Sequence, residues 1–144
     1  MIEYRKGGND DLDLDAVIEL YTASTLGMRR PVDDRQRMSQ MMQLGNLLIT
    51  AWEGDLLVGI SRSVTDFAWM TYLADLAVRQ SHQRRGIGKE LIRRTQQAAP
   101  QAILLLLAAP AAVDYYAHIG FEHMPQAWVL RPGSSVTSDE EISA

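Results

Sequence analysis

The 144-residue chain contains no cysteine. This absence excludes disulfides, thiolate metal sites and a cysteine nucleophile together, so any acyl transfer must be direct or pass through another nucleophile. The chain also lacks a run of the roughly 20 apolar residues that a membrane helix requires. Its start, from Met1 to Lys6, lacks the apolar core of a signal peptide. We therefore expect a cytoplasmic protein that has no contact with a membrane.

Charge of one sign is scarce as well. The formal net charge is −4, which does not favour a nucleic-acid partner, because binding along a phosphate backbone calls for a basic face. Three acidic residues, Asp139, Glu140 and Glu141, gather in a Ser/Thr-rich end, and we expect a flexible tail over residues 133 to 144. With 47% hydrophobic and 22% charged residues, the chain is typical of a globular protein. We expect one domain over residues 1 to 132.

Hydrophobic periodicity and turn residues predict alternating strands and helices. In chain order we expect a strand over residues 2–5, a helix over 14–21, a helix after Asp33 or Asp34 that ends at Gly45, a hairpin of 47–52 and 56–64, a strand over 69–78, a helix over 87–98, a strand over 103–107, a helix from Pro110 to Gly120, and closing strand material over 121–131. The apolar run 103–107 suits a strand buried on both faces. The methionine row of the second helix, Met38, Met41 and Met42, is expected in the core. The order implies a mixed sheet covered on both faces.

The most informative segment follows the apolar stretch 73–78. It reads Gln83, Arg84, Arg85, Gly86, Ile87, Gly88 and Lys89. Gly86 and Gly88 have no Cβ, so the backbone can press its N–H groups against an anion. The helix that follows directs its positive end and its unpaired N–H donors at the same place. This strand, turn and helix predict a pyrophosphate site.

Two better-known phosphate loops do not match this turn. A dinucleotide fingerprint needs a third glycine where Leu91 stands. A Walker A loop needs glycine at the position of Gln83 and Ser or Thr at that of Glu90. The histidines His82, His118 and His123 have no metal-ligand spacing, so no metal site is expected. His82 is expected in an exposed turn.

Two motifs together resemble the Gcn5-related N-acetyltransferases. The turn matches Q/R-x-x-G-x-G/A, the acyl-CoA-binding motif of that family, and residues 112 to 121 match its later signature A-x-x-F/Y-Y-x-x-x-G-F. They occur in the right order, with a helix and a strand between them. The resemblance implies an α/β fold with a mixed, mostly antiparallel central sheet flanked by helices on both faces.

The activity that the resemblance implies is direct transfer of an acetyl group from acetyl-CoA to a primary amine of a small molecule or peptide. The family positions for the cofactor are Leu76, Ala77 and Val78 for the pantetheine arm, and Gln83, Arg84, Arg85, Gly86, Ile87, Gly88 and Lys89 for the pyrophosphate and adenosine phosphate. The backbone N–H of Val78 would polarise the thioester carbonyl. The alternatives are a non-catalytic acyl-CoA-binding or sensing module and an unrelated phosphate-binding protein. A homodimer is left open.

By the same resemblance, Tyr116 is the general acid that protonates the departing CoA sulfur, since it stands four residues before Gly120. Its alternative is a packing tyrosine with the hydroxyl on the rim of a helix. Tyr115 is expected in the core. The chain departs from the family at Ala109, where an Asn that contacts CoA is common.

Asp75 is the candidate base. It lies within an apolar strand, where a carboxylate needs a cation, a donor or a raised pKa. It could hold the substrate ammonium or take its proton through water, or it could be a structural carboxylate bonded to backbone or an arginine; Asp66 or an ordered water is the next candidate. The segment from Thr25 to Gly45 would overlie the acceptor cleft by family analogy. Its mixed charge suits polyamines, amino acids, antibiotics and peptide N-termini alike.

Overall fold

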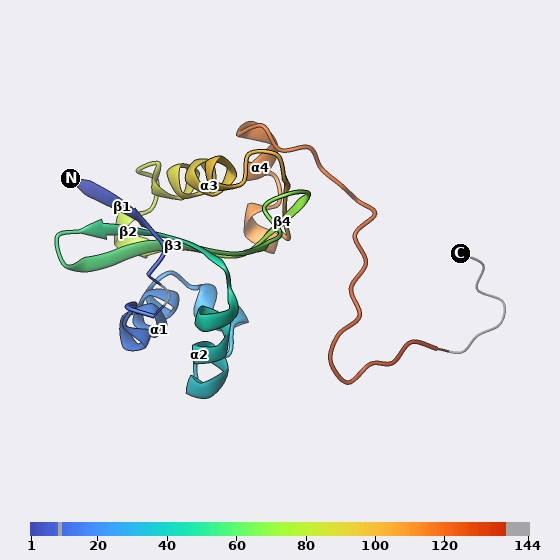
Figure 1. The fold of residues 1–144 in the computed structure, drawn as a ribbon, viewed down its shortest axis with the longest axis horizontal. Coiled ribbons are helices and arrows are strands. Elements are labelled where there is room, and N and C mark those ends of the chain that lie inside the picture. Colours follow the sequence, from blue (N-terminus) through green and yellow to red (C-terminus); the bar gives the residue numbers. More distant parts are fainter. Residues whose placement is uncertain (9, 138–144) are drawn as a thin grey trace. The chain divides into compact units, whose positions relative to one another are not determined.

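A computed structural model describes residues 1–8 and 10–137 and shows two compact units (Figure 1). The first spans Met1–Ala108 and the second begins at Ala109. Each unit is considered by itself. The acidic residues Asp139, Glu140 and Glu141 lie outside the described residues.

The first unit is built on a five-stranded sheet in the order β1-β2-β3-β4-β5. The strands are β1 (Ile2–Lys6), β2 (Leu47–Glu53), β3 (Leu56–Thr65), β4 (Met70–Val78) and β5 (Ile103–Leu106). The first four pair antiparallel with their neighbours, and β5 pairs parallel to β4. The prediction of a mixed, mostly antiparallel sheet is therefore confirmed.

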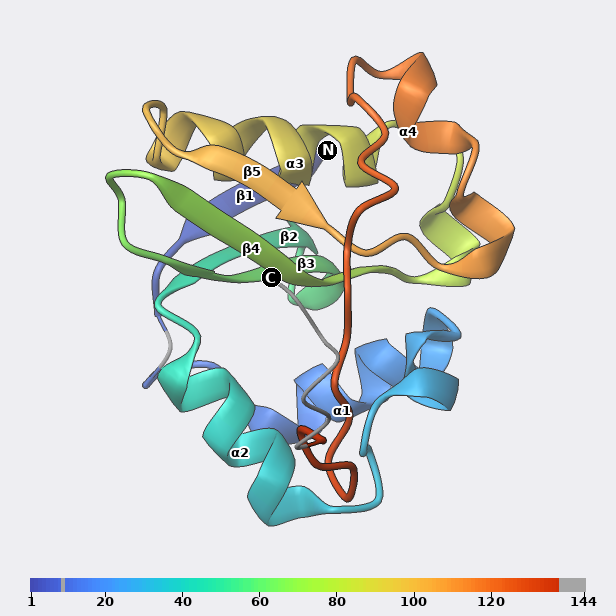
Figure 2. The ribbon, with the colours of Figure 1, turned by 90° about the vertical axis from the view of Figure 1, so that its right-hand side faces the viewer.

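Helices cover both faces of this sheet (Figure 2). They are α1 (Leu14–Ala23), α2 (Arg35–Leu44) and α3 (Ile87–Ala98), with short 3-10 helices at Leu26–Arg29 and Gln80–His82. The side chain of Asp34 accepts a hydrogen bond from the N–H of Arg37 at 3.1 Å, and α2 ends at Gly45. Both helix limits were predicted, because capping residues and glycine act on their immediate neighbours.

Two hydrophobic clusters form the core, one on each face. The first joins α1 and α2 to the sheet through residues such as Leu20, Tyr21, Met38 and Ile60. The second joins α3 to the other face through Ile87, Leu91 and Val58, among others. Met38 and Met42 are 0% and 4% exposed, which confirms that the methionine row packs in the core.

The expectation that residues 103 to 107 are buried on both faces is wrong. The strand β5 ends at Leu106 and is the last strand of the sheet, so no described residue pairs with its outer edge. Ile103 is 47% exposed and Leu107 is 60% exposed. An apolar run alone does not distinguish a central strand from an edge strand.

The second unit also differs from expectation. Its regular structure consists of a 3-10 helix at Pro110–Ala112 and a short α4 (Tyr115–His118), in place of one continuous helix. Gly120, with φ of +103°, follows α4 as predicted. No strand forms over residues 121 to 131 of the described chain, and Tyr115 is 44% exposed, so its assignment to the core is wrong.

Packing of α1 on the sheet predicts the response to one matched pair of variants. Leu20 is fully buried, whereas Leu44 at the end of α2 is 76% exposed. Leu20→Ala should lower the free energy of unfolding by about 2–5 kcal/mol through lost burial and a residual cavity. Leu44→Ala should stay within about 0.5 kcal/mol of wild type in the same urea titration. Similar losses in both would mean that α1 does not pack as described.

Candidate active site

The site begins where β4 outruns β5. The last pair between them joins Leu73 to Leu106, while β4 continues to Val78. Beyond Leu73, the strand therefore pairs with β3 on one side and with no described strand on the other. Leu76, Ala77 and Val78, the predicted residues for the cofactor arm, lie on this open edge.

A β-bulge marks the same point. The register between β3 and β4 shifts at Arg62, which pairs with Asp75, while Ser63 pairs with Leu73. Ala74 is thus the extra residue on β4. Bulges bend a strand and interrupt its ladder, so the bulge lies where β4 leaves β5.

The turn after β4 brings the chain back to this edge. The side-chain Nε2 of Gln83 donates to the carbonyl of Val78 at 3.0 Å. Arg84 and Gly86 both have positive φ, 64° and 82°, a conformation that glycine adopts without steric cost. A Cβ added at Gly86 would meet nothing within 4 Å. The turn therefore leaves space beside Gly86.

The N-terminus of α3 faces this space without a cap. The first N–H groups of a helix have no partner within it, and no side chain caps α3 at Gly86. A Cβ at Gly88 would lie 3.7 Å from Val78 Cγ2 and 4.0 Å from Leu76 Cδ2, so the first turn of α3 adjoins the end of β4. Gly59 of β3 permits this approach, because a Cβ there would come within 3.0 Å of Leu91. The predicted cofactor residues are thus brought together; Ile87 is buried and offers only its backbone.

Basic side chains surround the turn. Arg84 and Lys89 are exposed, and Arg85 lies 3.6 Å from Glu53. The one acidic residue in the first turn of α3, Glu90, is paired with Arg93 and Arg94, and these hydrogen bonds lower its pKa to about 2. Its charge is therefore compensated, and the field at the helix start favours an anion.

His82 holds the turn in place. The expectation that it is exposed is wrong, since its exposed fraction is 7%. Its Nε2 lies 3.1 Å from Glu53 Oε1 and its Nδ1 lies 2.7 Å from Ser81 Oγ. The hydrogen bond with His82 lowers the pKa of Glu53. These contacts tie the turn to the end of β2, a pairing that sequence spacing does not reveal.

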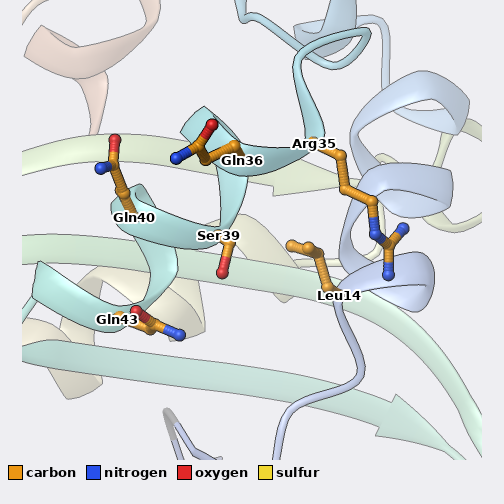
Figure 3. A pocket seen from close by; sticks show the side chains of 6 residues that line it. All are labelled: Leu14, Arg35, Gln36, Ser39, Gln40 and Gln43. Carbon is orange, nitrogen blue, oxygen red and sulfur yellow. The ribbon is translucent and has the colours of Figure 1, made fainter.

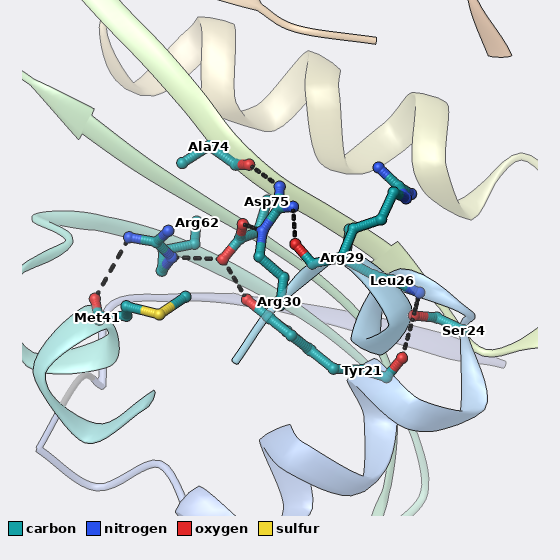
Figure 4. A network of polar contacts seen from close by, with 9 residues as sticks. All are labelled: Tyr21, Ser24, Leu26, Arg29, Arg30, Met41, Arg62, Ala74 and Asp75. Atoms are coloured by element: carbon teal, nitrogen blue, oxygen red, sulfur yellow. Dashed lines mark hydrogen bonds and ion pairs between the residues drawn. The ribbon is translucent and has the colours of Figure 1, made fainter. Parts of the chain in front are cut away.

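Asp75 lies in a buried polar network (Figure 4). Its carboxylate is 1% exposed and accepts three hydrogen bonds: Oδ1 accepts from Arg30 Nε at 2.5 Å, and Oδ2 accepts from Arg62 Nε and Tyr21 Oη, both at 2.6 Å. The hydroxyl of Tyr21 stays neutral, because burial and the adjacent carboxylate raise its pKa well above the ordinary value. Tyr21 and Arg62 were not identified from the sequence, and Arg30 was named only as part of the segment over the acceptor cleft.

This network bears on the role of Asp75. Burial by itself would raise the pKa of its carboxyl group, but the hydrogen bonds and charge of Arg62, with the bonds from Tyr21 and Arg30, outweigh burial and lower the pKa. A carboxylate with a lowered pKa binds a proton weakly. The geometry therefore favours the structural alternative, a carboxylate bonded to arginine, and the catalytic role of Asp75 stays a prediction.

Asp66, the next candidate base, caps the turn between β3 and β4. Its Oδ1 accepts from the N–H groups of Ala68, Trp69 and Met70, at 2.9, 2.8 and 3.1 Å, and these bonds lower the pKa of its carboxyl group. The predicted turn is confirmed, and the carboxylate has a clear structural role there.

Tyr116, the candidate acid, belongs to the second unit. It is half-buried on α4, and its ring makes edge contacts with Tyr115 and Phe121, each with centroids 5.4 Å apart. The carbonyl of Tyr116 accepts from the N–H of Phe121 at 3.0 Å. The signature A-x-x-Y-Y-x-x-x-G-F thus forms one local cluster of rings after α4.

A separate surface groove of about 590 Å³ lies along α2 (Figure 3). Its lining consists of Leu14, Arg35, Gln36, Ser39, Gln40 and Gln43. None of these residues belongs to the turn or to β4. Within the described parts of the chain, no cluster of three or more His, Asp or Glu could hold a metal ion, and no helix has the length and apolar character to cross a bilayer.

Known proteins share this architecture. The sequence profile of the acetyltransferase (GNAT) domain matches residues 22 to 137. A GNAT-family acetyltransferase from Streptococcus pneumoniae superposes with a TM-score of 0.72 at 26% identity, over 91% of this chain and 99% of that one. A predicted acetyltransferase from Clostridium acetobutylicum, solved with acetyl-CoA, superposes with a TM-score of 0.71 at 16% identity, over 91% and 96%.

One curated relative is similar in sequence. The chloroplastic GCN5-related N-acetyltransferase 2 of Arabidopsis thaliana is 32% identical over 73 residues, which cover 49% of this chain. The match covers only 28% of that longer protein.

The Asp75 network predicts a pH-dependent stability. Asp75→Asn should lower the free energy of unfolding at pH 7 by about 3–5 kcal/mol, because two arginines lose a buried counter-charge. The folded pKa of Asp75 lies below its unfolded value, so its contribution is complete above about pH 4 and is lost as the pH falls through the folded pKa. Denaturant titrations from pH 2.5 to 7 measure both effects.

Asp33→Asn is the matched control, since Asp33 is exposed on the same side of the chain before α2. It should keep the wild-type stability within about 0.5 kcal/mol. If Asp75→Asn were as stable as this control and shifted only the kinetics, the carboxylate would be catalytic and not structural.

Proposed function

Because the chain belongs to the GNAT acetyltransferase family, we propose that it is an N-acetyltransferase that moves the acetyl group of acetyl-CoA directly to a primary amine of a small molecule or peptide. The observation that carries this proposal is the uncapped start of α3 beside the open edge of β4. A helix N-terminus binds phosphate groups, and a free strand edge binds an extended, amide-bearing arm. Acetyl-CoA has both parts.

The residues at the site fit such a ligand. The space beside Gly86 is open, and the conformation there requires glycine. The N–H groups of Ile87, Gly88 and Lys89 are the donors that a pyrophosphate would accept from, and Arg84 and Lys89 add charge. The amides of the pantetheine arm would pair with the backbone of Leu76, Ala77 and Val78.

Bound acetyl-CoA supplies an activated acetyl group as a thioester. The N–H of Val78 would stabilise charge on the thioester oxygen as the amine attacks. The Tyr116 hydroxyl would give its proton to the departing sulfur. The absence of cysteine supports a direct transfer to the amine, with no thioester on the protein itself.

The cofactor site is tested by a pair of glycine variants. Gly86 and Gly54 both have positive φ, 82° and 60°, and both have nothing within 4 Å of an added Cβ. Valine at either position should therefore strain the backbone alike. Only Gly86→Val should lower CoA affinity, by about 10-fold or more, because only its side chain enters the phosphate space. Titration calorimetry measures the affinity; equal CoA binding by folded Gly86→Val and Gly54→Val would refute the proposed cradle.

The acid is tested by a pair of tyrosine variants on the same helix. Tyr116→Phe should lower kcat by about 10²- to 10⁴-fold while CoA affinity is nearly unchanged, because one proton donor is lost. Tyr115→Phe should retain wild-type kcat. Release of CoA can be followed with a thiol reagent, since the protein has no thiol of its own.

The same assay separates the enzyme from a non-catalytic acyl-CoA-binding module. Tight binding of acetyl-CoA without thiol release for any amine in a broad panel would support the module. Equal rates for wild type and Tyr116→Phe across the pH range would leave Tyr116 as a packing residue.

A further inference from the structure

Resting on the proposed function, we propose that Arg30 selects the acceptor: the amine that this protein acetylates also carries a carboxylate, which Arg30 binds. The starting observation is the position of the guanidinium. Arg30 Nη2 donates to the carbonyl of Ala74 at 2.8 Å. Ala74 is the bulged residue at which β4 leaves β5, so Arg30 lies at the beginning of the open edge.

The charge count at this position favours an anion. Asp75 contributes one negative charge, and Arg30 and Arg62 contribute two positive charges through direct contacts with it. Tyr21, the third partner, is neutral. Both oxygens of Asp75 are engaged, so no part of the carboxylate is available to attract an ammonium group. A surplus of one positive charge remains next to the β4 edge.

Neighbouring acidic groups do not cancel this surplus by contact. Asp34 caps α2 through the N–H of Arg37, and Asp33 is exposed. Among the described residues, Asp75 is the only carboxylate that pairs with Arg30 or Arg62. The first acid along β4 thus faces inward and is already satisfied.

Arg30 also retains donors for a ligand. Its Nε donates to Asp75, Nη1 to the carbonyl of Arg29 at 2.7 Å and Nη2 to Ala74. A guanidinium carries two further N–H groups, and these have no partner among the described residues. The side chain is 24% exposed, so a ligand can reach it, while burial of the remainder weakens screening by water. Arg62, 12% exposed, is less accessible and adds field.

A carboxylate is the group that matches these features. It accepts paired hydrogen bonds from a guanidinium, and such bonds are shorter and stronger than neutral ones. An amine that carries a carboxylate would place its nitrogen toward the open edge with its negative group on Arg30. Polyamines and other purely cationic acceptors would meet the surplus positive charge instead.

The test compares matched amines on wild-type protein with acetyl-CoA. L-amino acids and their carboxamides, for example leucine with leucinamide and glutamate with glutamine amide, are supplied in parallel with spermidine, and thiol release is measured. We expect kcat/KM to be about 10- to 100-fold higher for each acid than for its amide, the range typical of one charged hydrogen-bonding contact. The amide has the lower amine pKa and hence more free base, so this bias works against the expected result.

Two variants locate the effect. Arg30→Gln should bring the acid-to-amide ratio close to one, mainly through KM, and Arg30→Lys should restore part of it. Arg29→Gln is the control, because it removes the same charge from the adjacent, exposed residue and should keep the wild-type ratio. Thermal denaturation of each variant identifies any loss of folding, and the wild-type ratio tests the proposal even if Arg30→Gln does not fold.

The outcomes separate two failures. Absence of CoA binding and of thiol release with every amine would overturn the proposed function. Thiol release that is as fast with amides or spermidine as with acids would overturn the carboxylate site alone. An equal fall of the ratio in Arg30→Gln and Arg29→Gln would also overturn it, because the preference would then arise from net charge and not from Arg30.

Discussion

The separation of β4 from β5 is the constraint on which the site depends. Up to Leu73 the two strands are paired, and beyond it β4 continues alone to Val78. Backbone groups on a free edge remain available to a ligand. The chain then turns at once into α3, and Gly59 lets this helix approach the sheet closely. A free strand edge and a helix N-terminus are thus adjacent, which a fully paired sheet would not allow.

The buried carboxylate of Asp75 connects stability with selectivity. A charge in the interior requires partners, and this one has two arginines and a tyrosine. Because two cations surround one anion, satisfying Asp75 leaves positive charge beside the open edge. The same contacts that stabilise β4 against α1 therefore set the sign of the electrostatic field where the acceptor is proposed to bind.

The proposed chemistry divides between the two units of the chain. Residues of the first, at the end of β4 and the start of α3, would bind and orient the thioester through backbone groups. The second contains the ring cluster of Tyr115, Tyr116 and Phe121, from which one hydroxyl would supply the proton. Backbone binding explains why glycine and strand pairing matter more at this site than the identity of most side chains.

The sequence by itself determined what depends on neighbours in the chain. The limits of α3 match the predicted residues 87 to 98, Asp34 caps α2, and Gly86 adopts the positive φ that the turn motif required, because caps, turns and helical periods are local properties. Only the tertiary structure decided the partners of Asp75, which come from Tyr21, Arg30 and Arg62, separated from it by 54, 45 and 13 residues. It also decided that β5 is an edge strand and that His82 is buried against Glu53. These features depend on which strands lie side by side, and no periodicity within a single segment carries that information.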